Sequence, residues 1–201
     1  MRILITGAAR AIGATTARVL SERGHEVVAT AREVESLGAV EAALRLTLDV
    51  RETDSVAAAM EEAGPIDAIV NNAAITVGGP LEDYPIDQFR ATFETNTVGA
   101  LRMIQAVVPA WRDRGSGVIV NVSSIQGRVA TPLEGAYAAS KYALEAISET
   151  LHYELGHFGI RMVIVEPGYI APGMKDAGQH PGPEVYDELW EQWDNVSTTL
   201  N

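Results

Sequence analysis

The first thirteen residues, Met1–Gly13, read MRILITGAARAIG and decide the fold class. The apolar run Ile3–Ile5 is typical of a short buried strand, and Thr6-Gly7 ends it with a turn. A helical pattern then runs from about Ala11 to Arg23. Small residues in such a turn let the backbone approach a phosphate, and the free amides of the helix N-terminus attract it. The stretch therefore predicts a phosphate-binding turn; the alternative is a tight turn that binds nothing.

The rest of the chain repeats this alternation of strand and helix. Short runs rich in Val and Ile predict five further strands, and longer amphipathic stretches predict helices between them. Because the strands show little polar alternation, we expect an α/β domain whose doubly wound parallel sheet is covered on both faces, giving three α/β/α layers. Ligands of such sheets bind outside the carboxyl ends of the strands. The expected strands are Glu26–Thr30, Leu44–Leu48, Asp67–Asn71, Gly117–Val122 and Ile160–Glu166, and the expected helices are Glu52–Ala63, Thr95–Arg114 and Gly135–Phe158, with shorter ones after Arg32 and Pro85.

The composition excludes several classes of function. The 201-residue chain has a formal net charge of −12, so we expect no nucleic acid partner. It has no cysteine, which excludes a disulfide framework and a thiol nucleophile, and the spacing of its four histidines predicts no metal site. No apolar run approaches the roughly 20 residues of a membrane span, and the first residues do not resemble a signal peptide. We therefore expect a cytoplasmic protein of one domain with no membrane partner.

Two arginines point to a particular dinucleotide. In doubly wound sheets, NAD sites place an acidic residue after the second strand to bind the ribose 2′-hydroxyl. This chain has Ala31 and then Arg32 at that place, and Arg10 lies in the first turn. Two guanidinium groups bind a 2′-phosphate through charge-assisted hydrogen bonds, whereas a carboxylate repels it. The arginines predict a preference for NADPH over NADH; the alternative is a pair of solvated surface side chains.

A tyrosine and a lysine four residues apart predict acid–base chemistry. Tyr137 and Lys141 lie one turn apart on the same face of the helix expected at Gly135–Phe158. A free tyrosine has a pKa near 10, which is too high for a proton shuttle at neutral pH. A cation about 4 Å away lowers that pKa by roughly three units before desolvation takes some back. We therefore expect Lys141 to bring the pKa of Tyr137 towards neutrality, although such pairs are also common on helix surfaces.

Together these motifs resemble the short-chain dehydrogenase/reductase family, in its compact single-domain branch that prefers NADP. The resemblance is collinear over about residues 2–172 and implies a Rossmann-like fold. It rests on three stretches: Thr6-Gly7-x-x-x-Ala11-x-Gly13, with alanine for the family's middle glycine, Asn71-Asn72-Ala73-Ala74, and Pro167-Gly168. It also rests on single residues that match the family's motifs: Asp49, Asn96, Ser124 thirteen residues before Tyr137, and Lys141. Arg10 and Arg32 stand at the family's basic positions.

The resemblance also implies the roles of individual residues. Ser124 is expected to hydrogen-bond the substrate oxygen, Tyr137 to give or take its proton, and Lys141 to hold the nicotinamide ribose. Asn96 is expected to anchor a water relay to Lys141. The implied function is hydride transfer between NADP(H) and the carbonyl or secondary alcohol of a small hydrophobic substrate, in a homodimer or homotetramer; the alternative is a non-catalytic NADP-binding regulator or structural partner. The residues expected to contact the cofactor are Gly7, Arg10, Ile12, Gly13, Arg32, Asp49, Val50, Asn72, Ala73, Tyr137, Lys141, Pro167, Gly168 and Ile170.

Three positions depart from the family pattern near the expected cofactor. Ala11 and Ala74 each add a methyl group where the family has glycine, and alanine is tolerated at such a position if its φ is negative. Pro172 stands where the family usually carries a threonine, and it offers neither a hydroxyl nor an N–H.

The C-terminal segment is expected to close over the site. We expect residues 1–172 to form the dinucleotide-binding catalytic part and residues 173–201 a substrate loop or lid of the same domain. Gly173–Pro183 is rich in Gly and Pro and is expected to be mobile, and a helix with Trp190 and Trp193 on one side is expected after it. These aromatics either press on a bulky apolar substrate or cover the edge of the sheet. We expect the sheet to lack a seventh strand at that edge. The sequence is then either that of a shorter protein or that of a piece of a longer one.

Overall fold

The computed structural model describes residues 1–170 and 179–199, which contain one parallel sheet of six strands. Their order is β3-β2-β1-β4-β5-β6, the doubly wound order expected from the sequence. All six expected strands are confirmed, and their ends differ by one residue at most. The strands are β1 (Arg2–Ile5), β2 (Glu26–Ala31), β3 (Leu44–Thr47), β4 (Ala68–Asn71), β5 (Gly117–Val122) and β6 (Ile160–Val165).

Strand β1 lies at the centre of the sheet, where the chain changes direction. Leu4 pairs with Val28 of β2 on one side and with Ile69 of β4 on the other, and all three side chains are fully buried. The chain steps outward from β1 to β3, then returns to β4 and continues outward to β6. Ligands bind at this switch point in doubly wound sheets. The turn after β1 and the segment after β4 therefore flank the same crevice.

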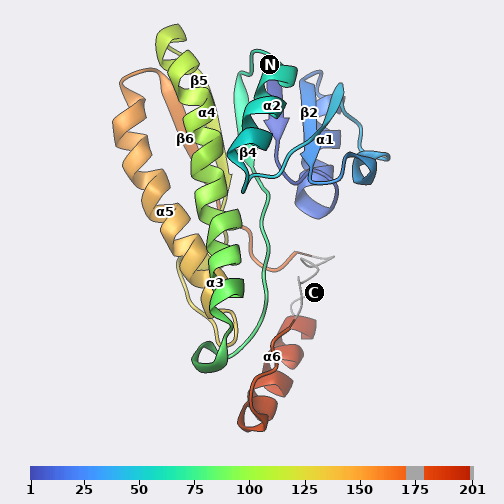
Figure 1. Ribbon diagram of the computed structural model, residues 1–201, viewed down its shortest axis with the longest axis vertical. Coiled ribbons are helices and arrows are strands. Elements are labelled where there is room, and N and C mark those ends of the chain that lie inside the picture. The colour runs from blue at the N-terminus through green and yellow to red at the C-terminus, as the bar shows by residue number, and fades with distance from the viewer. Residues whose placement is uncertain (171–178, 200–201) are drawn as a thin grey trace.

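Helices cover the two faces of the sheet (Figure 1). α2 (Thr53–Ala63), α4 (Gly99–Arg114) and α5 (Gly135–Gly156) pack on one face, and α1 (Ala11–Glu22) packs on the other. These two layers confirm the expected α/β/α arrangement. On the face of the sheet that α1 covers, β6 is partly exposed, and about two-fifths of the surface of Val163 and of Val165 is accessible to solvent.

The short helix expected after Pro85 and the long helix expected at Thr95–Arg114 are both present, and a π-helical turn joins them. The structure has α3 (Ile86–Phe93), a π-helical turn (Glu94–Val98) and then α4, without a break in the chain direction. The Thr95 hydroxyl donates to the Ala91 carbonyl oxygen, four residues earlier, at 2.9 Å, and such bonds bend helices. π-helical turns are frequent at functional sites. This one carries Asn96, one of the expected catalytic residues.

The helix expected near the C-terminus is α6 (Asp187–Thr199), which follows a 3₁₀ turn at Glu184–Tyr186. Figure 1 shows α6 apart from the two layers of helices. Of the segment expected to be mobile, residues 173–178 lie outside the described residues, as does Pro172. Further 3₁₀ turns occur at Val34–Leu37, Leu81–Asp83 and Ile125–Gly127. Among the helices that the structure describes, none is long and apolar enough to span a bilayer.

Candidate active site

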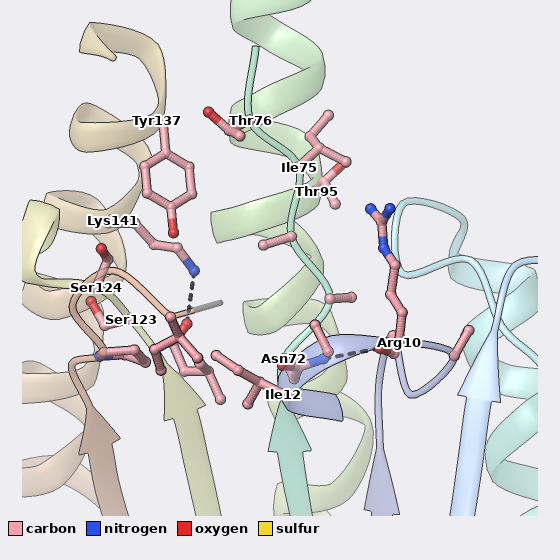
Figure 2. Close-up of a pocket in the computed structure, with 18 of the residues that line it drawn as sticks. Arg10, Ile12, Asn72, Ile75, Thr76, Thr95, Ser123, Ser124, Tyr137 and Lys141 are labelled. Atoms are coloured by element: carbon pink, nitrogen blue, oxygen red, sulfur yellow. Dashed lines mark hydrogen bonds between the residues drawn. The ribbon is translucent and has the colours of Figure 1, made fainter. Parts of the chain in front are cut away.

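A cleft of about 1160 Å³ opens at the carboxyl ends of the strands. Figure 2 shows Arg10 on one side of it, Ser124, Tyr137 and Lys141 on the opposite side, and Ile12 between the two groups. The segment after β4 crosses between them. Thirteen of the fourteen residues expected to contact the cofactor line this cleft, and the exception is Gly13. The structure therefore brings the expected residues together, and their contact with a cofactor stays a prediction.

Two glycines of the first turn are needed because backbone segments approach closely there. Gly7 has a φ of +64°, in the left-handed region, and a Cβ at this position would lie 2.9 Å from the Cα of Ala73. Gly13 is buried within α1, and a Cβ there would lie 2.5 Å from the Gly7 carbonyl oxygen. Gly13 thus lets α1 pack against the turn, a role that differs from the expected contact with the cofactor.

Ala11 does not have the negative φ at which alanine is tolerated. Its φ is +46°, in the left-handed region that costs an L-residue roughly 1–2 kcal/mol. The backbone therefore keeps the conformation that suits the family's middle glycine, and the alanine strains it. Ala74 has no positive φ, so its backbone conformation suits alanine.

Side-chain hydrogen bonds hold the turn against the segment after β4. The Asn72 amide nitrogen Nδ2 donates to the carbonyl oxygens of Thr6 and Gly7, each at 3.0 Å. The Thr6 hydroxyl oxygen accepts from the backbone N–H groups of Asn72 and Ala73, also at 3.0 Å. These bonds fix the two sides of the crevice relative to each other.

The end of the cleft beside β2 and β3 is lined by three arginines. Arg10 and Arg32 were expected there, whereas Arg51 was not. Arg51 forms a two-point pair with Asp49, with Nε–Oδ1 at 3.0 Å and Nη2–Oδ2 at 2.6 Å. Hydrogen bonds from Arg51 lower the pKa of the Asp49 carboxyl, so this group is an ionised acceptor at neutral pH. Glu33 also lines this end, a carboxylate that the sequence analysis did not consider.

Ser124, Tyr137 and Lys141 meet at the other end of the cleft (Figure 2). Ser124 follows β5, and its Oγ accepts from the backbone N–H of Gln126 at 3.1 Å. Tyr137 and Lys141 lie in α5, with the lysine Nζ 5.6 Å from the centroid of the tyrosine ring. The same Nζ donates to the carbonyl oxygen of Val122 at 2.7 Å. The ammonium is therefore held by the end of β5.

The protonation states at this end differ from the expectation. Burial raises the pKa of Tyr137 to about 12, with a hydrogen bond from Ser124 opposing the rise and the Glu134 charge adding to it. Burial lowers the pKa of Lys141 from 10.5 to about 8, while the Glu145 charge raises it. The expectation that Lys141 brings the tyrosine pKa towards neutrality is wrong for this structure, because burial raises that pKa instead. At neutral pH the phenol is protonated and the ammonium is charged.

Asn96 lies behind the wall of the cleft and positions its neighbours. Its Oδ1 accepts from the backbone N–H of Ile75 at 2.8 Å, and its Nδ2 donates to the Ile75 carbonyl oxygen at 2.9 Å. Nδ2 also donates to Ser140 Oγ at 3.0 Å, and the side chain is almost fully buried. Asn96 thus ties the segment after β4 to α5 beside Lys141. The expected water relay stays a prediction.

The residues present fit a nicotinamide dinucleotide. The first turn of α1 contains no acidic residue, and the N-terminal amides of a helix favour a phosphate. Gly7 keeps a Cβ out of the same turn. The cleft runs from Arg32 beside β2 to Tyr137 on α5, across the switch point of the sheet. This is the path that a dinucleotide takes in doubly wound folds.

Aromatic side chains from the C-terminal segment lie at the mouth of the cleft. Trp193 and Tyr169 both line it, and their ring centroids are 6.0 Å apart. Trp190 packs against Gly78, where a Cβ would lie 2.9 Å from the indole ring. Of the two arrangements considered for this segment, these described contacts match a position over the cleft rather than along the edge of the sheet.

Three polar residues at this end were missed by the sequence analysis. Thr76, Gln126 and Glu134 line the cleft near the phenol, and Glu134 Oε2 accepts from the Thr76 hydroxyl at 2.7 Å. Gln126 lies two residues after Ser124, and Glu134 lies three residues before Tyr137. Their nearness to the motif residues along the chain is the signal that could have identified them.

The chain resembles known proteins over most of its length. The model of the short chain dehydrogenase family matches residues 1–181. A 3-ketodihydrosphingosine reductase from Bacteroides thetaiotaomicron is 40% identical over 179 residues, which cover 87% of this chain and 65% of that protein. The chain therefore spans slightly less than two thirds of that relative's length.

Solved structures agree with this match. A short-chain dehydrogenase from Streptomyces avermitilis superposes with a TM-score of 0.83 at 33% identity, over 93% of this chain and 73% of that one. A gluconate 5-dehydrogenase from Burkholderia cenocepacia, solved in complex with NADP and tartrate, gives a TM-score of 0.78 at 34% identity, over 84% and 71% of the two chains. With the sheet order, the first turn and the Tyr137–Lys141 pair on α5, these matches show that the chain belongs to the short-chain dehydrogenase/reductase family.

Proposed function

We propose that the protein is an NADP(H)-dependent oxidoreductase that interconverts a carbonyl group and a secondary alcohol, with Tyr137 as general acid and base. The observation that carries this proposal is the protonated Tyr137 phenol beside Ser124 and Lys141, in a cleft that fits a dinucleotide. When bound, the dihydronicotinamide ring supplies a hydride to the carbonyl carbon. The remaining steps belong to side chains of this chain.

In the direction of reduction, the Tyr137 phenol gives its proton to the carbonyl oxygen, which becomes the hydroxyl of the product. The Ser124 hydroxyl donates a hydrogen bond to the same oxygen and polarises the carbonyl. The charged Lys141 ammonium stabilises the phenolate left on Tyr137, an interaction that grows as the proton leaves. Oxidation of an alcohol uses the same groups in reverse.

The preference for NADP is proposed from the charges at the end of the cleft beside β2 and β3, where the adenosine of the cofactor would lie. Arg10 and Arg32 line that end, and Arg51 is neutralised by its pair with Asp49. The guanidinium groups of Arg10 and Arg32 match the 2′-phosphate that distinguishes NADP from NAD. Glu33, on the same rim, sets a limit on this preference because a carboxylate disfavours the phosphate.

The substrate is proposed to be a largely hydrophobic small molecule. Tyr169, Ile170 and Trp193 line the cleft, and the rings of Tyr169 and Trp193 lie 6.0 Å apart, centroid to centroid. We further propose that the protein works in the cytoplasm. We also propose that it forms a homodimer or homotetramer, and analytical ultracentrifugation would test this oligomeric state.

The experiment follows NADPH absorbance while the purified protein is mixed with a panel of apolar ketones, and NADH is compared in parallel. Oxidation of NADPH by at least one ketone, faster than oxidation of NADH, supports the proposal. Tight NADPH binding without turnover on any ketone would instead support the non-catalytic regulator or structural partner.

A further inference from the structure

Arg128 follows the turn that begins at Ser124, and its side chain contacts three carboxylates. The 3₁₀ turn after Ser124 ends at Arg128. The Arg128 guanidinium donates from Nε to Glu166 Oε1 at 3.0 Å and from Nη1 to Glu149 Oε1 at 3.2 Å. Its Nη2 lies 3.1 Å from Glu145 Oε2. Each of the three nitrogens of this group therefore faces a different carboxylate.

The three carboxylates belong to two segments that supply other parts of the site. Glu145 and Glu149 lie one turn apart on α5, the helix that carries the proposed proton donor. Glu166 follows β6 and directly precedes Pro167-Gly168, which lines the cleft. Arg128 and these carboxylates lie outside the described residues that line the cleft. Arg128 thus joins three segments of the site without reaching the cleft itself.

The contact with Glu145 is the most important of the three. Only 3% of the Glu145 side chain is exposed, whereas 38% of Glu166 and 58% of Glu149 are exposed. Ion pairs at exposed positions contribute little, but removal of one partner of a buried pair leaves an uncompensated charge. Neither carboxylate oxygen of Glu145 accepts a hydrogen bond within the described residues, so this group depends on nearby cations. Arg128 is one of them, and Lys141, one helical turn before Glu145, is another.

The turn after Ser124 lies directly against the same carboxylate. A Cβ at Gly127 would lie 3.1 Å from Glu145 Oε1, so glycine lets the turn approach α5 closely. On the other side, the backbone N–H of Ile125 donates to the carbonyl oxygen of Pro167 at 2.9 Å. The position of the turn therefore depends on its attachment to α5 and to the segment after β6.

This position decides where the Ser124 hydroxyl lies. Figure 2 shows Ser124 and Tyr137 on the same side of the cleft, and their side chains are hydrogen-bonded to each other. In the proposed reaction both hydroxyl groups donate to one carbonyl oxygen, so the spacing between the turn and α5 has to be held. A displacement of about 1 Å in such a site can slow the reaction by about 100-fold.

We propose that Arg128 is a positioning residue, which attaches the Ser124 turn to α5 and to the segment after β6 and so holds the Ser124 and Tyr137 hydroxyl groups at the spacing that one carbonyl oxygen requires. This inference rests on the proposed function and adds a residue to the same site. Arg128 acts through Glu145 and Glu166, which it contacts, and not on the substrate or the cofactor.

The first test compares Arg128→Gln with wild type at about pH 6.5, where Lys141, with a pKa of about 8, is charged. We expect kcat for a ketone to fall by about tenfold or more, because the Ser124 hydroxyl is displaced. The Kd for NADPH should change by less than about threefold, since Arg128 lies outside the cleft. An unchanged kcat would overturn the proposal.

The matched control is Arg114→Gln. Arg114 also joins several segments, and one of its contacts is with Asp67, but they lie at the amino ends of β4 and β5, at the opposite edge of the sheet from the cleft. Arg114→Gln should lower the midpoint of thermal unfolding and keep kcat within about twofold of wild type. A fall in kcat as large as that of Arg128→Gln would show that lost stability alone explains the effect, and would overturn the proposal.

Arg128→Lys separates attachment from charge. Lysine keeps a cation beside the buried Glu145, which preserves the fold even if Arg128→Gln does not fold. Its single ammonium cannot face three carboxylates as the guanidinium does, so most of the loss in kcat should remain. A wild-type kcat in Arg128→Lys would show that charge alone is sufficient and would overturn the proposal.

A double-mutant cycle tests whether Arg128 acts through Ser124. Ser124→Ala removes one donor to the carbonyl oxygen, which costs about 10²–10³-fold, and single-turnover oxidation of bound NADPH measures the rate that is left. Adding Arg128→Gln to Ser124→Ala should slow this rate by about twofold or less, because the hydroxyl that Arg128 positions is already absent. A further loss of about tenfold would contradict action through Ser124.

Amide hydrogen exchange tests the attachment without catalysis. The backbone N–H groups of Ile125 and Gln126 are both hydrogen-bonded within the turn or to the segment after β6. Their exchange should be about tenfold or more faster in Arg128→Gln and unchanged in Arg114→Gln. If wild type reduces no ketone, the oxidoreductase proposal fails, whereas unchanged exchange at Ile125 and Gln126 contradicts the role of Arg128 by itself.

Discussion

The Lys141 ammonium lies 5.6 Å from the centroid of the Tyr137 ring and donates at 2.7 Å to the carbonyl oxygen of Val122. It therefore approaches the face of the tyrosine while its hydrogen bond goes to strand β5. The phenol, whose pKa is raised to about 12, stays protonated, and the pKa of the lysine is lowered to about 8. The pair enters the proposed reaction as a neutral acid beside a cation, the arrangement that carbonyl reduction requires.

The first prediction concerns the pH dependence of reduction of a neutral ketone. Its kcat/KM reports ionisations of the free enzyme. Lys141 is charged below its pKa of about 8 and neutral above it, so kcat/KM should fall as the pH rises through about 8. Tyr137, with a pKa of about 12, should cause no second fall in kcat/KM between pH 6 and pH 10. A stopped assay over that range measures the profile.

A variant identifies the group whose ionisation causes this falling limb of the profile, that is, the decrease in kcat/KM near pH 8. Glu145 follows Lys141 by one helical turn, is buried, and raises the lysine pKa. Glu145→Gln should therefore move the falling limb to lower pH. Glu154→Gln, on the exposed side of the same helix, should not move it. A limb that keeps its position in Glu145→Gln would mean that another group titrates.

The second prediction concerns the selection of NADP. Arg10→Ala and Arg32→Ala should each raise the Kd for NADPH by about tenfold or more and change the Kd for NADH little, because hydrogen bonds between charged groups contribute about 1.5–3 kcal/mol. Titration calorimetry at low salt measures both constants. The control is Arg18→Ala, an exposed arginine of α1 that pairs with Glu22. Equal Kd values for the two cofactors in wild type would contradict the predicted preference.

The third prediction concerns the strained turn. Ala11 has a φ of +46°, so Ala11→Gly should raise the free energy of unfolding by up to about 1 kcal/mol, the relief of strain exceeding the added chain entropy. The midpoint of thermal unfolding should rise by about 2–4 °C. Ala14→Gly, three residues further in α1, should instead lower the stability by about 1 kcal/mol. A loss of stability in Ala11→Gly would show that the turn is not strained at this residue.

Much of the fold was predictable because local signals agree with the tertiary structure. The runs Ile3–Ile5 and Gly117–Val122 are short, apolar and bounded by turns, and both are strands of the sheet. Since parallel strands end at one edge, the residues after them were expected to share a rim, and Arg10, Asn72 and Ser124 do line one cleft.

The remaining features depend on contacts between distant segments, which sequence patterns do not report. The hydrogen bond of Lys141 goes to Val122, nineteen residues earlier on β5, and decides where the ammonium lies. Glu134 accepts from the hydroxyl of Thr76, 58 residues earlier, and both residues line the cleft. The positive φ at Ala11 is likewise set by packing of the turn, since the residue itself disfavours that conformation.

The fourth prediction tests the proton transfer. Tyr137→Phe removes the phenolic oxygen while keeping the ring over which the Lys141 ammonium lies. NADPH should therefore bind with a Kd within about threefold of wild type, whereas kcat for the best ketone should fall by about 10²–10⁴-fold. The protein remains folded if its unfolding midpoint is unchanged.

The decisive measurement is the single-turnover rate of hydride transfer in Tyr137→Phe saturated with NADPH and ketone. We expect oxidation of bound NADPH to slow by at least about 100-fold relative to wild type. A variant that oxidises its bound NADPH at close to the wild-type rate would show that the carbonyl oxygen receives its proton from a group other than Tyr137.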